Sequence, residues 1–165
     1  MQTPPLVSVI IPSYNHVEFV IGALESVLNQ KYQNMEIIVV DDASTDGTAE
    51  LMTKMHDSRL RFIGLSKNRE HHARNLALKF ASGRYVAFQN SDDVWSQDKI
   101  STQVDLLENQ KHIAASFTEV ELIDPQGHFL ETSWATGIFT TENRSRLDWL
   151  RFFSVKVIAY AFHLQ

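Results

Sequence analysis

The sequence predicts an α/β protein with a mainly parallel sheet flanked by helices, built as a single domain over residues 1–165. Short apolar runs alternate four times with segments of helical periodicity, which is typical of βαβ units with right-handed crossovers. The apolar runs are continuous rather than alternating, as expected for strands that are covered on both faces. These two observations together favour an open parallel sheet between helical layers.

The strands are expected at residues 7–11, 36–40, 60–65 and 85–89, where β-branched and aromatic residues are concentrated. The first helix is expected to begin at Asn15, because Asn15 and Glu18 have the spacing of a capping box. The later helices are expected from apolar residues at helical spacing: Thr48, Leu51, Met52 and Met55, then Ala73, Leu76, Ala77 and Phe80, then Ile100, Val104 and Leu107. Ser44, Thr45 and Asp46 are candidate caps of the second helix, and Gly83 is expected to end the third.

The pattern changes after residue 112. We expect a strand at 113–123, a turn at 124–127, a hairpin partner at 129–134 and a helix at 146–153. The remaining residues, 155–165, are apolar without a clear stop. A sheet cut short in this region would leave an exposed edge, so we expect a homodimer or larger assembly with residues 155–164 near the contact.

Composition excludes several classes of function. A net charge of -5 and a pI near 5.8 argue against nonspecific nucleic-acid binding, and the absence of cysteine excludes disulfides and thiolate chemistry. No apolar run reaches the roughly 20 residues that a membrane span needs, and the first residues lack the features of a signal peptide. We therefore expect a cytoplasmic location, with peripheral association at the inner membrane face left open.

Acidic pairs follow two of the predicted strands. Asp41 and Asp42 come directly after residues 36–40, and Asp92 and Asp93 follow the fourth strand after a short polar stretch. Parallel sheets bind ligands outside the carboxyl ends of their strands. Carboxylates there suit a divalent cation and sugar hydroxyls, and a diphosphate ligand would need a bridging cation. The alternative is that these residues only cap helices or shape turns.

Other side chains near the same edge have two possible roles. Tyr14 can stack on a nucleobase or belong to a turn, and Arg74 can reach a base or diphosphate or be a solvated helix charge. Neighbouring residues on a helix do not face each other, so His71 and His72 are expected at the surface or rim of a site. The sequence contains no dinucleotide-binding glycine fingerprint, no phosphate-binding P-loop and no hydrolase nucleophile elbow.

Four segments in order resemble the family-2 glycosyltransferases: residues 7–15, 38–48, 73–75 and 91–95. The resemblance is strong from residue 6 to about 110 and loose to about 134. It implies the A-type glycosyltransferase fold, which is Rossmann-like, here C-terminally short. Residues 6–110 would be the nucleotide-sugar-binding half, and 111–165 an incomplete acceptor-side region.

The resemblance also implies a function. It implies transfer of a sugar, with inversion, from a UDP- or GDP-sugar to a hydroxyl of a saccharide or lipid-linked acceptor, in polysaccharide biosynthesis. By the same resemblance Asp92 would bind Mn2+ or Mg2+, and Asp93 would border the acceptor. The remaining donor-binding residues would be Pro12, Ser13, Tyr14, Asp41, Asp42, Arg74, Asn90 and Ser91, with Asn90 at a position that is usually acidic.

The sequence leaves the catalytic base unassigned, and Glu142 and Asp148 are merely available acids. The alternative function is a truncated, non-catalytic module that binds a nucleotide sugar without transferring it. A receiver-like signalling domain ranks lower, because its acidic pair would follow the first strand rather than the second.

Overall fold

The computed structural model describes residues 3–69, 72–110, 112–118, 121, 123, 124, 127, 128 and 161–163. The chain divides into two compact units, of which the larger comprises residues 1–116 and 159–165 and the smaller residues 117–158. The larger unit holds the sheet and every helix described below. In the described parts of the chain, no helix is long and apolar enough to cross a membrane.

The sheet has the strand order β3-β2-β1-β4-β6-β5, and its first four strands are parallel. The strands are β1 (Val7–Ser13), β2 (Met35–Asp41), β3 (Leu60–Gly64), β4 (Tyr85–Phe88), β5 (Ala115–Ser116) and β6 (Ala161–His163). The four predicted strands are confirmed, but β1 continues two residues further than expected and includes Pro12 and Ser13. This is the mainly parallel, Rossmann-like architecture that the sequence predicted.

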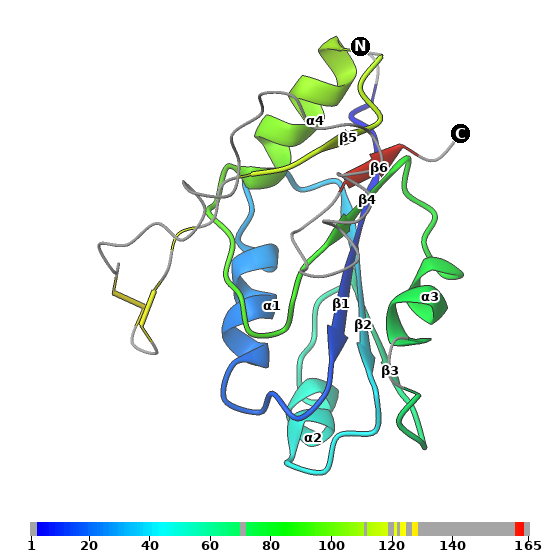
Figure 1. Ribbon diagram of the computed structural model, residues 1–165, viewed down its shortest axis with the longest axis vertical. Helices are drawn as coiled ribbons and strands as arrows, with labels where there is room; N and C mark the ends of the chain where they lie inside the picture. The colour runs from blue at the N-terminus through cyan, green and yellow to red at the C-terminus, as the bar shows by residue number, and fades with distance from the viewer. Residues whose placement is uncertain are drawn as a thin grey trace, which may run out of the picture. The chain divides into compact units, whose positions relative to one another are not determined.

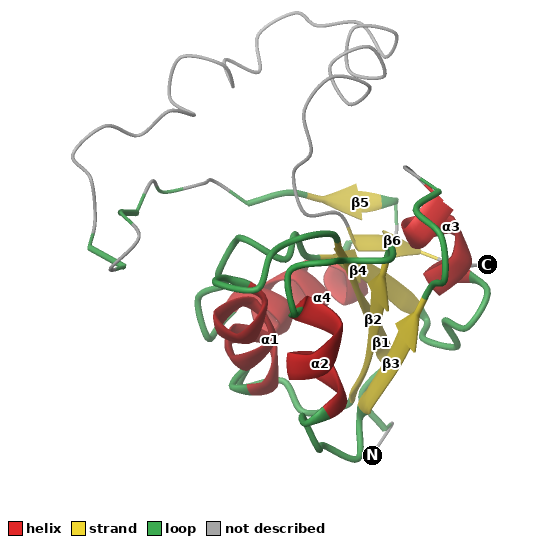
Figure 2. Ribbon diagram, turned by 90° about the horizontal axis from the view of Figure 1, so that it is seen from below, coloured by secondary structure: helices red, strands yellow, loops and turns green. Residues whose placement is uncertain are grey.

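Helices cover both faces of the sheet (Figures 1 and 2). The helices are α1 (Val20–Leu28), α2 (Thr48–Thr53), α3 (His72–Leu78) and α4 (Lys99–Asn109). One apolar core joins α1, α2 and α4 to one face through side chains such as Leu24, Met52 and Val104. A second core joins α3 to the other face, where Ala73 and Ala77 pack on Ile10 and Ile38.

Two expectations about helix ends are wrong. Asn15 does not cap α1, which begins at Val20; Asn15 instead takes a left-handed backbone conformation with φ 52°. Its side-chain oxygen accepts the backbone N–H of Thr45, 2.9 Å away. Phe80 is not in the buried stripe of α3, because the helix ends at Leu78 and the Phe80 ring is 41% exposed under the guanidinium of Arg61.

The region after residue 112 only partly follows the prediction. Within 113–123, the described residues form a strand only at Ala115–Ser116. The turn at 124–127 is supported by a hydrogen bond from the Gly127 N–H to the Asp124 carbonyl, 2.9 Å. The predicted hairpin partner and helix, at 129–134 and 146–153, lie outside the described residues. Dimerisation stays a prediction, although part of the segment assigned to the contact, Ala161–His163, pairs antiparallel with β4 as strand β6.

Gly83 is required for a different reason from the one expected. It follows α3 by several residues and lies against β1, where an added Cβ would be 2.6 Å from both the backbone nitrogen and the hydroxyl of Ser8. Its N–H donates to the Ser8 hydroxyl and to Glu36 Oε1, which also accepts from Ser8 and Ser82. Partial burial would raise the pKa of Glu36, but these hydrogen bonds hold it below its usual value.

We expect Gly83→Ala to lower the free energy of unfolding by about 1–3 kcal/mol, the usual cost of overpacking, because backbone and side-chain atoms of β1 must shift. Gly22→Ala is the matched control, since nothing lies within 4 Å of the added methyl group. In α1 that change should stabilise by about 1 kcal/mol. Urea unfolding of the two variants checks this, and equal stabilities would contradict the proposed close approach.

Candidate functional site at the carboxyl ends of β1, β2 and β4

The ends of β1 and β2 lie side by side because the two strands are parallel and in register. Ser13 pairs with Asp41 in that register, and the Asp42 N–H continues it by donating to the Ser13 carbonyl, 2.8 Å away. Pro12, Ser13 and Tyr14 therefore lie next to Asp41 and Asp42. The Tyr14 side chain is 46% exposed, so its ring is available for stacking.

The two carboxylates of the first acidic pair differ in their partners. Asp41 is buried, and its carboxylate accepts both the backbone N–H and the hydroxyl of Ser44, at 2.9 and 2.5 Å. This carboxylate shapes the turn that follows β2, which is the structural alternative considered for the pair. Asp42 is also buried, and its Oδ1 accepts the backbone N–H of Arg69, 2.9 Å away. Asp42 thus connects β2 to the loop before α3.

The backbone is strained at Ala43, which lies between the first acidic pair and Ser44 in the turn after β2. Ala43 has a φ of 61°, a left-handed conformation that residues with a side chain rarely adopt. The hydrogen bonds from Ser44 to Asp41 hold the backbone on either side of Ala43. Backbone strain of this kind is concentrated at functional sites, where the surrounding structure enforces it.

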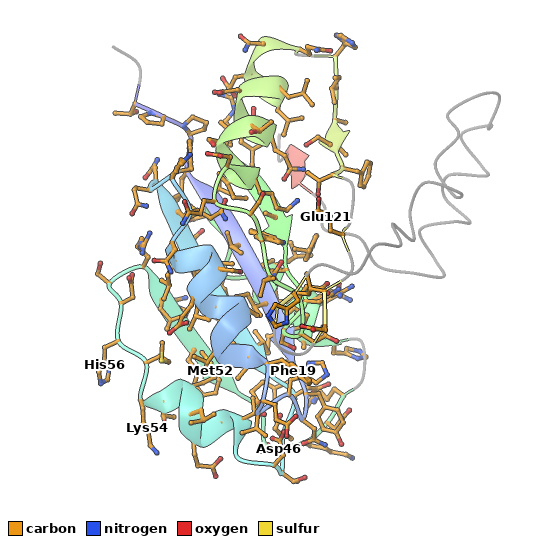
Figure 3. All side chains as sticks on the ribbon, turned by 90° about the vertical axis from the view of Figure 1, so that its left-hand side faces the viewer. Phe19, Asp46, Met52, Lys54, His56 and Glu121 are labelled. Carbon is orange, nitrogen blue, oxygen red and sulfur yellow. The ribbon has the colours of Figure 1, made fainter. Side chains whose placement is uncertain are left out.

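The loop after β1 also contacts the other two loops. Asn15 donates its N–H to the Ser44 hydroxyl, 2.8 Å away, and Asp46 Oδ2 accepts the N–H of Val17 at 2.9 Å. Figure 3 shows Asp46 and Phe19 at this same end of the sheet. His16 Nδ1 lies 2.7 Å from the Ser91 hydroxyl, which belongs to the loop after β4. Sequence patterns did not indicate His16 or Arg69, because both act through contacts distant along the chain.

The loop after β4 is tied to α3 and to itself by side-chain hydrogen bonds. The Arg74 guanidinium donates to Asn90 Oδ1 at 2.8 Å, and Asn90 Nδ2 donates to Asp93 Oδ2 at 2.8 Å. Arg74 also lies over the Phe88 ring, with 6.0 Å between the guanidinium carbon and the ring centroid. Asn90 therefore links a cation to a carboxylate, which an acidic residue could not do because it has no donor.

Two buried oxygen atoms at this edge have no hydrogen-bond partner among the described residues: Ser13 Oγ and Gln89 Oε1. The other end of the Gln89 amide donates to the Asp93 carbonyl at 2.5 Å, so this buried side chain holds the loop that carries the second acidic pair. An unpaired buried polar atom costs about 1–3 kcal/mol. Two of them at one edge are consistent with a site that gives up stability for function.

Asp92 is the carboxylate best suited to a cation. Its side chain is exposed, and no hydrogen bond or ion pair engages it within the described residues. Mg2+ and Mn2+ prefer oxygen ligands, but on the same short loop Asn90 Oδ1 already accepts from Arg74 and Asp93 Oδ2 accepts from Asn90. In the part of the chain that the structure describes, no group of three or more acidic or histidine side chains could hold a metal ion. A cation bound by Asp92 would therefore take most of its oxygen ligands from its substrate or from water.

Known proteins that resemble this chain identify the family to which it belongs. The model of glycosyl transferase family 2 matches residues 8–163, so the chain belongs to that family. A relative from Escherichia coli, the UDP-Glc:alpha-D-GlcNAc-diphosphoundecaprenol beta-1,3-glucosyltransferase WfaP, is 46% identical over 64% of this chain and 43% of its own length. The chain spans half or less of the length of the curated relatives it matches.

Solved structures support the same fold. The mannosyltransferase PcManGT from Pyrobaculum calidifontis, in complex with GDP-Man and Mn2+, is 31% identical with a TM-score of 0.65, over 72% of this chain and 36% of that one. The S. aureus protein TarS 1-349 in complex with UDP has a TM-score of 0.72 at 24% identity, over 95% of this chain and 46% of that one. The second likeness concerns the fold alone.

We expect Ala43→Gly to raise the free energy of unfolding by about 0.5–1 kcal/mol, because glycine adopts a positive φ without strain. Ala49→Gly in α2 is the control, since there the same change adds only backbone freedom and should destabilise by about 0.5–1 kcal/mol. Urea unfolding measures both. Loss of stability in both variants would contradict the strain assigned to Ala43.

Proposed function

We propose that this chain binds a nucleotide-diphosphate sugar at the carboxyl edge of its sheet and transfers the sugar, with inversion, to an acceptor hydroxyl. One observation carries the proposal. Loops after β1, β2 and β4 are joined by direct hydrogen bonds, from Asp42 to Ser13 and between His16 and Ser91. Candidate residues for the nucleoside and for the cation therefore lie at one edge of the sheet.

The nucleoside would be bound by the ends of β1 and β2. Tyr14 offers an exposed ring for stacking on the base, which contributes about 1–3 kcal/mol. Asp42 uses Oδ1 for Arg69 and can accept a further hydrogen bond from the base or ribose. Pro12 and Ser13 border this position. Asp41 contributes by holding the turn, since its carboxylate is already occupied by Ser44.

The diphosphate would be bound between α3 and the loop after β4. Arg74 carries a positive charge there and is held by Asn90, so it can attract phosphate oxygens without a large loss of side-chain freedom. Asp92 would hold Mn2+ or Mg2+, and Asn90 and Ser91 lie beside it. When bound, such a cation supplies Lewis-acid stabilisation of the charge that grows on the departing nucleoside diphosphate.

The reaction is a displacement at the anomeric carbon. The acceptor oxygen forms a bond to that carbon while the bond to the diphosphate breaks, and a general base takes the hydroxyl proton. Asp93 borders the acceptor side in this arrangement. The base is unassigned, and Glu142 and Asp148 lie outside the described residues. Stabilisation of the leaving group grows toward the transition state, so it raises the rate rather than only the affinity.

The names of relatives support the choice of ligands. WfaP is named for a UDP-sugar donor and a diphosphoundecaprenol acceptor, and PcManGT was solved with GDP-Man and Mn2+. We therefore propose a UDP- or GDP-sugar as donor and a saccharide or lipid-linked saccharide as acceptor. Polysaccharide biosynthesis, in the cytoplasm or at the inner membrane face, is the setting consistent with these substrates.

Asp92→Ala should abolish the part of donor affinity that depends on Mn2+, a loss of about tenfold or more, because the carboxylate that holds the cation is gone. Calorimetry with UDP, GDP and their sugars, with and without Mn2+, measures the effect. Asp105→Ala is the charge-matched control, since Asp105 is an exposed residue of α4. Unchanged metal dependence in Asp92→Ala would exclude the assigned role.

Asp42→Ala should weaken nucleotide binding about 10- to 150-fold even without a metal ion, because a charge-assisted hydrogen bond contributes about 1.5–3 kcal/mol. The same variant leaves the Arg69 N–H without its partner, so unfolding must be measured alongside binding. Asp41→Asn is the comparison variant. Because the Asp41 carboxylate accepts from Ser44, this change should mainly lower the free energy of unfolding. A larger loss of affinity in Asp41→Asn than in Asp42→Ala would reverse the two roles.

Analysis of the reaction product distinguishes sugar transfer from donor binding alone. Incubation with donor, Mn2+ and a lipid-linked or saccharide acceptor should yield a glycoside of inverted anomeric configuration, detectable by NMR. Donor binding without transfer and without donor hydrolysis would favour the alternative of a non-catalytic binding module. Retention of configuration would contradict the proposed single displacement.

A further inference from the structure

A hollow lies on the side of α3 away from the loop after β4. It has a volume of about 200 Å³ between the loop that follows β3 and the exposed face of α3. Its polar lining residues are Ser66, Lys67, Arg69, His72, Asn75 and Lys79. Among the described residues that line it, none is acidic, although the whole chain carries a net charge of -5. Positive charge is therefore concentrated locally on an acidic protein.

The cations of this hollow are exposed and not neutralised by the described residues around them. No ion pair engages Lys67, Arg69 or Lys79 in the described parts of the chain. The loop itself is held in place, because the Arg69 N–H donates to Asp42 Oδ1 and the Arg69 carbonyl lies 2.7 Å from His72 Nδ1. The backbone of Arg69 is thus held by hydrogen bonds at both its N–H and its carbonyl.

An exposed aromatic side chain lies beside Lys79. Phe80 follows Lys79 just beyond the end of α3 and is 41% exposed. Arg61 on β3 lies over the Phe80 ring, with 5.3 Å between its guanidinium carbon and the ring centroid. We call the surface formed by Arg61, Lys67, Arg69, His72, Lys79 and Phe80 the α3 flank.

The α3 flank is distinct from the candidate donor site. His72, Asn75, Leu76 and Lys79 recur at helical spacing, so they share one side of α3. Arg74 leaves the helix on another side and donates to Asn90 in the loop after β4. A ligand in the hollow and a donor bound at Arg74 would therefore contact different sides of α3. Binding at the hollow does not require a bound donor.

We propose that the α3 flank docks the protein on a membrane surface that contains anionic phospholipid, with a headgroup phosphate in the hollow. Cationic side chains beside an exposed aromatic ring are typical of an interfacial surface, because the cations attract anionic headgroups while the ring enters the headgroup boundary. A soluble phosphate would use the cations but would leave Phe80 in water. The inference does not depend on the proposed transferase activity.

Vesicle sedimentation tests the proposal. The wild-type chain should bind vesicles of phosphatidylcholine with phosphatidylglycerol, bind pure phosphatidylcholine at least tenfold more weakly, and lose binding as salt is raised. Lys67→Glu with Lys79→Glu should weaken binding about thirtyfold or more, since each lysine near an anionic surface contributes about fivefold. Phe80→Ser should weaken it through loss of the apolar contact, and the urea unfolding midpoint of each variant shows whether it is folded.

Lys54→Glu is the matched control, because Lys54 ends α2 on the opposite face of the sheet and points into solvent (Figure 3). It should bind vesicles like the wild type. Equal binding by Lys67→Glu with Lys79→Glu and by wild type would overturn the proposal. So would equal binding to both vesicle types, or binding of inorganic phosphate by a protein that ignores vesicles.

Discussion

The parallel register of β1 with β2 and β4 is the constraint on which the candidate site depends. Ser13 pairs with Asp41 in one direction, and Ile10 pairs with Phe88 in the other. Three loops distant in sequence therefore leave the sheet at one edge. Hydrogen bonds then join them, from Asp42 to Ser13 and between His16 and Ser91. The apolar strands thus make the site possible, while the loop residues give it its chemistry.

Carboxylates in this chain divide into those that hold the fold and those left for ligands. Glu36 gathers donors from Ser8, Ser82 and Gly83 at the amino end of the sheet, and Asp41 takes both donors of Ser44 at the carboxyl end. Asp92, by contrast, is exposed on a loop that Gln89 and Asn90 hold in place. Residue type alone does not separate these roles; the number of donors already committed to each carboxylate does.

Sequence patterns predicted the parts of the fold that depend on local periodicity. The apolar runs predicted the four parallel strands, and the two acidic pairs lie at the carboxyl edge of the sheet, where the sequence placed them. The patterns failed where a distant contact decides the structure: Asn15 bonds to Thr45 rather than capping α1, and Gly83 is required by β1 rather than by α3. The different partners of Asp41 and Asp42 could not be predicted from sequence patterns. Neither could the hydrogen bond between His16 and Ser91. Strand β6 had no local signal, because its short segment is defined by its pairing with β4 and β5.

Paramagnetic broadening by Mn2+ in the presence of UDP tests the central claim most directly, since it reports which backbone amides lie near a bound cation. The account predicts that amide signals of residues 13–16, 41–44 and 89–93 broaden together, and that broadening disappears when Asp92 is replaced by alanine. Broadening of only one of the three loops, or of amides remote from the carboxyl edge of the sheet, would contradict a single shared site.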